Sequence, residues 1–483
     1  MKHRIFISFL HFFILSLFFS SAGAKVVLPS VLADNMVLQQ QTEVNIWGKA
    51  APGKTVTVSS TWSKQKYKTQ AASDSTWLVR MQTPEAGGPY ELTVSDGDKL
   101  TLRNVLIGEV WFCSGQSNME MLMRGFDRQP LTDGSNNVIA RAKASTPVRM
   151  FLCDNDADGH WQRQWARTPQ TDVKGRWCLN EPQNVALCSA AAYYFAQFVQ
   201  EVLEVPVAVI VSTLGGSRIE CWMQQSGPVT EPDVKQHATP GVLYNAKVAP
   251  FQNYAVRGFL WYQGESNRDN AKDYAHLMKT MVSQWREAWK SKEAPLGAVG
   301  GAALPFYFVE IAPYDYEGAD KTSSAYLREA QQRAAREIPN AAMISLLDAG
   351  NYNFIHPVNK RVVGERLALQ ALGRTYGRTG FGYEQPMYKD MELKDGKIYI
   401  NVTGAVQGLC PMWTSLKGFE IAGSDRVFHP AFAEIETKSC RLAVSSKDVP
   451  EPVAVRYCFK NYAEASVFNI YGLPLAPFRT DNW

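Results

Sequence analysis

The chain has 483 residues, of which 46% are hydrophobic and 20% are charged, and its formal net charge is +4. This ordinary globular composition excludes wholesale disorder, a collagen-like repeat and a small disulfide-stapled scaffold, and the low charge does not indicate a nucleic-acid partner. At roughly 150 residues per domain, the length predicts about three domains.

The first 24 residues are expected to be an export signal that is removed. Lys2 and Arg4 precede a mostly apolar run over residues 5–19, and small residues follow at 22–24, as a signal peptidase requires. The run is shorter than the ~20 residues that span a bilayer, and an uncleaved anchor is the alternative. We expect an exported protein, periplasmic or extracellular, with no membrane insertion after signal removal. The mature chain would have 483 − 24 = 459 residues and a charge of 4 − 2 = +2.

The chain contains eight cysteines, which permit disulfides in an exported protein but do not define their pairing. In a chain of this size, cysteines are more often small buried apolar residues. No CxxC and no paired Cys/His spacing is present, so no metal site is predicted.

Residues 25–105 predict an N-terminal β-sandwich domain. Segments at 43–47, 55–58 and 90–94 alternate apolar and polar residues, and turn-forming residues separate them. From residue 381 to 483 short strands return, which predicts a C-terminal β domain.

Between them, residues 106–380 predict an α/β domain. The expected strands are 110–113, 205–211, 259–262, 306–311 and 342–347, and the expected helices are 186–203, 274–285, 325–338 and 359–376. Alternation of this kind is typical of a parallel sheet with helices on both faces.

Ligands of such a sheet bind beyond the carboxyl ends of its strands, and chemically suited residues stand there. They are Ser117, the pair Gly215 and Gly216, Asn267, and His356. Acyl transfer requires this set: a hydroxyl nucleophile, a base that titrates near neutrality, and fixed donors for an oxyanion. Each piece alone has a structural explanation as a turn, a helix cap or a solvated histidine, and only their convergence favours catalysis.

These segments resemble the signature blocks of the sialate O-acetylesterase family, a branch of the SGNH hydrolases. The blocks are FCSGQSNME at 112–120, GGSRIECW at 215–222, WYQGESN at 261–267 and IHPVNK at 355–360, with further similarity at 418–423 and 472–481. The resemblance implies an SGNH-hydrolase-like three-layer α/β/α domain with a parallel sheet, flanked by N-terminal and C-terminal β-sandwich-like domains. It also implies a serine esterase without a metal or other cofactor.

Carried over position by position, the resemblance implies that Ser117 is the nucleophile and His356 the general base. The oxyanion hole would combine the backbone amide of Ser117, an amide of the Gly215–Gly216 turn, and the side-chain amide of Asn267. Gly216 is the favoured glycine of the two.

The group that orients His356 stays open. Many SGNH enzymes place an aspartate two or three residues before the histidine, where this chain has Phe354 and Asn353. A backbone carbonyl is the first choice, which would give a Ser-His dyad, and the carboxylates of Glu265 and Asp348 are the alternatives.

The leading interpretation is a secreted carbohydrate esterase, most closely a sialate O-acetylesterase, that deacetylates an acetylated sugar or glycan through an acetyl-serine intermediate. An acetylxylan or other polysaccharide O-acetylesterase is the alternative, because the blocks report the reaction and the pocket walls select the sugar. A catalytically inactive carbohydrate-binding protein is a further alternative, because the expected aspartate is missing. The oligomeric state is left open.

Overall fold

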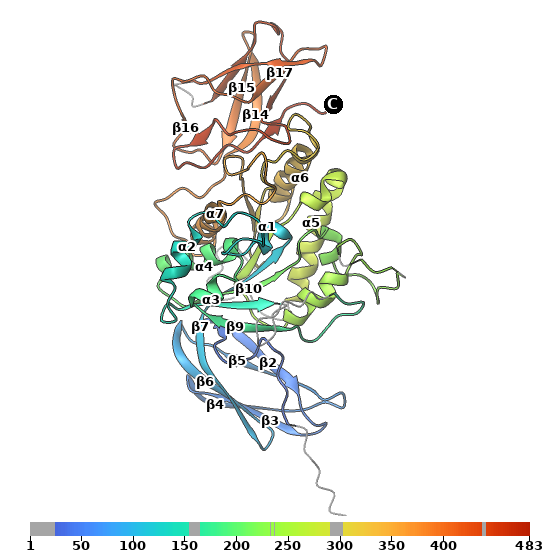
Figure 1. Ribbon diagram of the computed structural model, residues 1–483, viewed down its shortest axis with the longest axis vertical. Coiled ribbons are helices and arrows are strands. Elements are labelled where there is room, and N and C mark those ends of the chain that lie inside the picture. The colour runs from blue at the N-terminus through green and yellow to red at the C-terminus, as the bar shows by residue number, and fades with distance from the viewer. Residues whose placement is uncertain (1–24, 154–164, 232, 236, 290–302, 437–440) are drawn as a thin grey trace, which may run out of the picture.

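The computed structural model describes residues 25–153, 165–231, 233–235, 237–289, 303–436 and 441–483. The expected export signal therefore lies outside the described residues. The molecule is elongated, and three parts follow one another along its long axis (Figure 1). The α/β part lies in the middle, with the N-terminal β part at one end and the C-terminal β part at the other.

The N-terminal part is built from short strands. These are β1 (Val37–Gln39), β2 (Glu43–Lys49), β3 (Thr55–Ser60), β4 (Ser63–Gln70), β5 (Thr76–Gln82) and β6 (Gly87–Ser95). Strands β2 and β5 pair antiparallel, while β4, β3 and β6 form a second antiparallel group. On β5, Trp77, Val79 and Met81 are buried and the residues between them are exposed, which is the alternation that the sequence predicted.

Strand β7 (Lys99–Gly115) belongs to two parts of the molecule at once. Its first half pairs antiparallel with β6, and its second half pairs parallel with β10 (Val207–Thr213) and β11 (Gly258–Tyr262). The domain boundary expected at residue 105 falls inside this strand.

The α/β sheet has the strand order β13-β12-β11-β7-β10-β8-β9. The strands not yet given are β8 (Val148–Cys153), β9 (Gly175–Leu179), β12 (Phe306–Val309) and β13 (Ala341–Ile344). All neighbours are parallel except β9, an edge strand antiparallel to β8, and the sequence predicted neither of these two. Since β10 and β11 flank β7 on opposite sides, the strand order switches at β7, and a crevice is expected at its carboxyl end.

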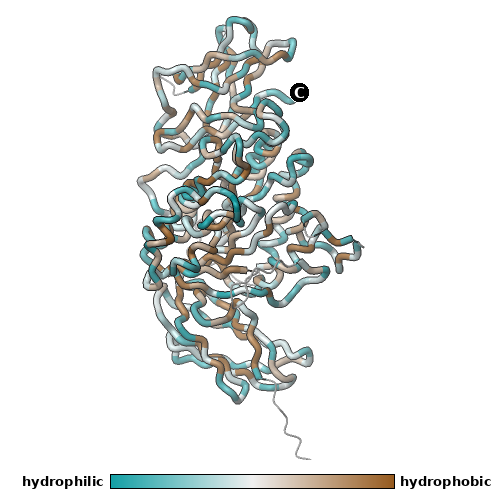
Figure 2. The backbone as a smooth tube through the Cα atoms, viewed as in Figure 1, coloured by the Kyte–Doolittle hydropathy of each residue, from teal (hydrophilic) through white to brown (hydrophobic). Residues whose placement is uncertain are grey.

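Helices cover both faces of this sheet, as predicted (Figure 1). Helices α4 (Ala190–Leu203) and α7 (Lys360–Arg374) pack on one face, and α5 (Ala271–Ala288) and α6 (Ser323–Glu337) pack on the other. Trp111 of β7 belongs to the core under α4 and α7, whereas its neighbour Phe112 belongs to the core under α5 and α6. Figure 2 shows the resulting hydrophobic band through the middle of the molecule. The expected three-layer α/β/α architecture is thus confirmed.

The C-terminal part contains small antiparallel sheets. One sheet joins β14 (Met387–Lys394), β15 (Lys397–Thr403), β20 (Leu442–Ser445) and β19 (Phe432–Ile435), and another joins β18 (Phe428–Pro430), β17 (Phe419–Ala422), β21 (Ala454–Tyr457) and β23 (Phe478–Arg479). Strands β16 (Leu409–Cys410) and β22 (Phe468–Asn469) form a further sheet of two strands. Asn461 attaches this part to the α/β domain, since its Oδ1 accepts the backbone amide of Ser324 at 2.9 Å.

Seven of the eight cysteines lie in the described residues, and all seven are free thiols, while Cys440 lies outside those residues. Within the described ranges, no helix is long and apolar enough to cross a bilayer.

Candidate active site

Ser117 stands at the carboxyl end of the central strand, on a tight turn. It is the first residue of the one-turn helix α1 (Ser117–Glu120), which follows β7 directly. Gly115 closes β7 with φ +145°, and a Cβ at that position would lie 2.1 Å from the carbonyl oxygen of Tyr262, so only glycine fits. The turn leaves Ser117 partly exposed, and it leaves the Ser117 backbone amide in the first turn of a helix, where no intrahelical acceptor exists.

The Gly215–Gly216 turn lies beside Ser117. A Cβ on Gly215 would come within 3.3 Å of the Ser117 Cβ. The Gly215 amide donates a short hydrogen bond to Glu120 Oε2, so that donor is already in use. No acceptor for the Gly216 amide is found among the described residues, and its φ of +75° suits glycine. Of the two glycines, Gly216 is therefore the better placed to serve an oxyanion.

His356 faces the same space from the loop before α7. Its Nδ1 lies 3.1 Å from Gln129 Oε1, and the rings of Phe126 and Phe354 pack edge-on against it at 5.2 and 5.8 Å. An amide oxygen can only accept, so Nδ1 carries the proton and Nε2 is left as the basic nitrogen. Burial, together with the charge of Lys360, lowers the pKa of His356 to about 4, which keeps the ring neutral near neutral pH.

These groups converge on one open pocket of about 470 Å³. Its wall consists of Gln116, Ser117, Glu120, Phe126, Gln129, Gly215, Gly216, Glu265, Ser266, Arg268, Ile355 and His356. A hydroxyl, a neutral imidazole and free amide donors in one pocket are the equipment of acyl transfer. Among the described residues, no cluster of three or more His, Cys, Asp or Glu side chains is arranged to hold a metal ion.

Asn267, expected in the oxyanion hole, does not line this pocket. It is fully buried, and its Oδ1 accepts from the Ile219 amide at 2.9 Å while its Nδ2 donates to Glu220 Oε2 at 2.9 Å. The pocket wall contains another side-chain amide, that of Gln116. Its Oε1 is turned inward to the amides of Gly264 and Ser266 at 3.2 and 3.3 Å, which leaves its NH₂ group as the donor.

Comparisons with known proteins identify the family of the chain. The family model "Carbohydrate esterase, sialic acid-specific acetylesterase" matches residues 107–372, more than half of the chain. The chain belongs to this family. Sialate O-acetylesterases of Mus musculus and Pongo abelii are 26% and 29% identical, over 95% of this chain and 95% and 93% of their own lengths. A crystal structure of a carbohydrate acetylesterase from Xanthomonas citri is 33% identical, with a TM-score of 0.83 over 95% of this chain and all of that one.

The resemblance seen in the sequence is thereby confirmed, and membership of the sialic acid-specific acetylesterase family makes the chain a carbohydrate esterase. The sequence left three groups open as the one that orients His356: a backbone carbonyl, Glu265 and Asp348. Gln129 occupies the Nδ1 side of the ring, so the partner is a carbonyl oxygen, but one from a side chain rather than from the backbone.

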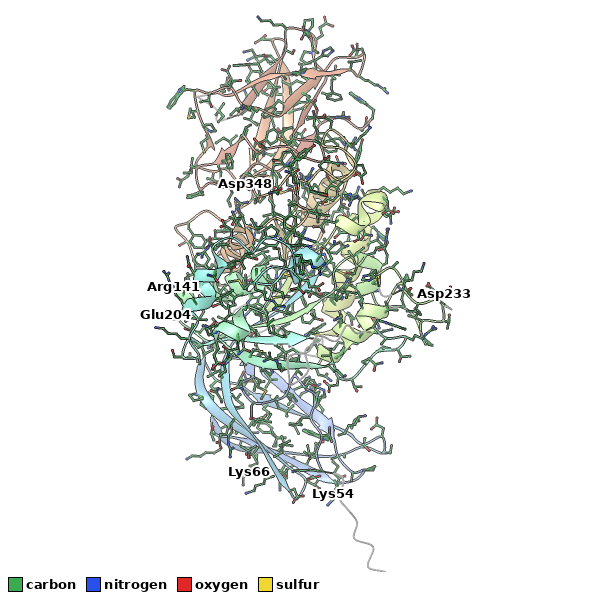
Figure 3. The ribbon with its side chains drawn as sticks, viewed as in Figure 1. Lys54, Lys66, Arg141, Glu204, Asp233 and Asp348 are labelled. Atoms are coloured by element: carbon green, nitrogen blue, oxygen red, sulfur yellow. The ribbon has the colours of Figure 1, made fainter. Side chains whose placement is uncertain are left out.

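Neither expected carboxylate contacts the histidine. Asp348 forms a two-pronged ion pair with Arg366, at 2.7 and 2.6 Å, and lies toward the C-terminal part (Figure 3). Glu265 does line the pocket, but its Oε1 accepts from Asn118 Nδ2 at 2.6 Å, and burial raises the pKa of its carboxyl. Gln129 and Gln116 line the pocket beside the expected residues, and the sequence pattern did not single them out.

Proposed function

We propose that this chain is an exported serine esterase that removes O-acetyl groups from sialic acid. The observation that carries the proposal is the convergence of Ser117, neutral His356 and the Gly216 amide on one pocket, within blocks shared with sialate O-acetylesterases.

In the proposed reaction, His356 Nε2 removes the proton of Ser117 as its Oγ attacks the acetyl carbonyl. The oxyanion that forms is stabilised by the amides of Ser117 and Gly216 and by the NH₂ group of Gln116. The sugar oxygen leaves with the proton from His356, and an acetyl-serine remains. His356 then deprotonates a water molecule, which releases acetate and restores the serine.

Arg268 supports sialic acid as the substrate. Its guanidinium lines the pocket, with one N–H bonded to the Glu265 carbonyl at 2.7 Å and another paired with Glu317 at 2.6 Å. The Nε–H group is buried, so one further N–H on each terminal nitrogen remains for a ligand, and a guanidinium suits the carboxylate of a sugar acid. An acetylated neutral polysaccharide such as acetylxylan is the second candidate, because the Xanthomonas citri relative has the broader description of carbohydrate acetylesterase.

Replacement of Ser117 tests the reaction. Ser117→Ala should abolish hydrolysis of 4-nitrophenyl acetate. Ser114→Ala is the matched control, because Ser114 is a buried serine of the same segment whose hydroxyl has no partner and lies outside the pocket. Turnover retained by folded Ser117→Ala would refute the esterase mechanism and favour a binding role.

Acetate release measured in parallel on O-acetylated sialic acid and on acetylxylan tests the substrate. A preference for the sialic acid that Arg268→Gln removes supports the proposal, whereas faster release from acetylxylan refutes it. Export is tested by N-terminal sequencing of the protein recovered outside the cytoplasm, which should begin at Lys25. A chain found only in the cytoplasm and starting at Met1 would contradict export.

A further inference from the structure

A buried network of side chains links the segment of the nucleophile to the segment of the base. At its centre is Asn118, the residue after Ser117. Asn118 Oδ1 accepts from Lys360 Nζ at 2.5 Å, and Nδ2 donates to Glu265 Oε1 at 2.6 Å and to the Ile355 carbonyl at 3.1 Å. Ile355 immediately precedes His356, so one amide ties both catalytic segments together.

Lys360 makes the orientation of this amide unambiguous. An ammonium group can only donate, so the Asn118 oxygen must face Lys360 and the NH₂ group must face Glu265 and Ile355. All the hydrogen-bonding groups of the Asn118 amide are then used, and the amide cannot rotate without losing three bonds.

Lys360 is placed where a cation is disfavoured on two counts. It is fully buried, and it is the first residue of α7, the positive end of the helix dipole. Its compensation comes from Asn118 Oδ1, from the ring of Tyr262 at 5.4 Å and from the charge of Glu265, which does not contact it directly. A residue that violates two local preferences is expected at a functional position rather than at a structural one.

We infer that Asn118 and Lys360 are positioning residues of the esterase: Asn118 holds the His356 loop against the turn of Ser117, and buried Lys360 fixes the Asn118 amide and sets the charge environment of that loop. The inference rests on the proposed function, in which His356 is the base. The charged groups near the ring are Lys360, four residues further along the chain, and Glu120, Glu265 and Arg268 in the pocket wall.

Lys360 is the group among these whose charge acts on His356. After burial, it is the cause that lowers the pKa of His356 to about 4. Burial lowers the pKa of Lys360 itself only to about 7, so the lysine is still charged in the range where His356 titrates. Burial raises the pKa of Glu265, which favours its protonated form as the pH falls.

The test is the pH dependence of kcat/KM for 4-nitrophenyl acetate in Lys360→Met, Lys360→Arg and Glu265→Gln. Lys360→Met removes a like charge near the imidazole. The acidic limb of the profile, where kcat/KM falls with falling pH, should therefore move to higher pH by about half to one pH unit. Lys360→Arg keeps the charge and should keep the limb. Glu265→Gln keeps an acceptor for Asn118 and imitates the protonated carboxyl, so its limb should also stay in place.

An acidic limb that does not move in Lys360→Met, or that moves equally in Lys360→Arg, would overturn the inference and leave Lys360 a purely structural residue. If Lys360→Met does not fold, Lys360→Gln removes the same charge with a polar side chain. Asn118→Ala should lower kcat by about tenfold without moving the limb, and an unchanged kcat would refute its positioning role. The proposed function itself is tested separately, because turnover retained by folded Ser117→Ala would refute it.

Discussion

Replacement of Gln129 by alanine and by glutamate separates the position of His356 from its charge environment. Gln129 Oε1 is a neutral acceptor 3.1 Å from His356 Nδ1. One neutral hydrogen bond contributes about 0.5–1.5 kcal/mol, and a factor of ten in rate corresponds to about 1.4 kcal/mol. Gln129→Ala should therefore lower kcat by roughly two- to tenfold while the fold is kept, since Gln129 is exposed.

Gln129→Glu should act on the pH profile instead. An adjacent carboxylate raises the pKa of an imidazole by about 1–3 pH units, and His356 starts from about 4. The neutral ring is the base, so activity is lost as the pH falls through this pKa. The acidic limb of kcat/KM should accordingly move to higher pH in Gln129→Glu and stay close to that of the unmodified chain in Gln129→Ala.

The assay is hydrolysis of 4-nitrophenyl acetate at saturating and limiting substrate across the acidic range, with melting temperatures as the control for folding. An unmoved limb in Gln129→Glu, or full activity of Gln129→Ala at every pH, would show that Gln129 does not orient the histidine.

Two further predictions concern the oxyanion hole and the buried carboxyl of Glu310. Gln116→Ala should lower kcat by about 10²–10³-fold, as loss of an oxyanion donor does. Asn267→Ala should mainly lower the melting temperature. If steady-state kinetics instead show the large loss of kcat in Asn267→Ala and not in Gln116→Ala, Asn267 is the donor. Burial raises the pKa of Glu310 to about 7, against the charge of Arg328, so the folded state holds a proton that the unfolded state releases above about pH 4.5. The free energy of unfolding should then fall by on the order of 3 kcal/mol as the pH rises from about 4.5 toward 7. In Glu310→Gln, urea titrations at several pH values should show a weaker dependence of this free energy on pH. The same pH dependence in Glu310→Gln and in the unmodified chain would contradict the prediction.

Within the parallel sheet, the strands that the sequence predicted are those with mainly apolar runs, because a parallel strand buried on both faces has no polar side. Strands β8 and β9 were not predicted, because charged residues interrupt their apolar runs. Arg149 interrupts β8, and Arg176 leaves only a short apolar run in β9. Both arginines remain tolerable because their guanidinium groups find acceptors in the fold, such as Asn184 Oδ1 at 3.2 Å from Arg176.

Some residues of the candidate site could likewise be predicted from the sequence, and others could not. Ser117, Gly216 and His356 could be predicted because each follows a strand of the sheet, and strand ends meet at one edge. Gln129 could not, because it lies in an irregular segment whose course only tertiary packing determines. The role of Asn267 depends on which way its amide faces, and that is set by Glu220, a partner 47 residues away.

The continuity of β7 from Lys99 to Gly115 has a consequence for how this enzyme can be altered. The strand is central to an eleven-stranded sheet, and its start is paired in the N-terminal part while its end carries the nucleophile turn. A shortened chain that begins at residue 106 would lose the first half of its own central strand together with the neighbour that aligns it. The N-terminal part is thus not an exchangeable module, because it aligns the strand that leads to Ser117.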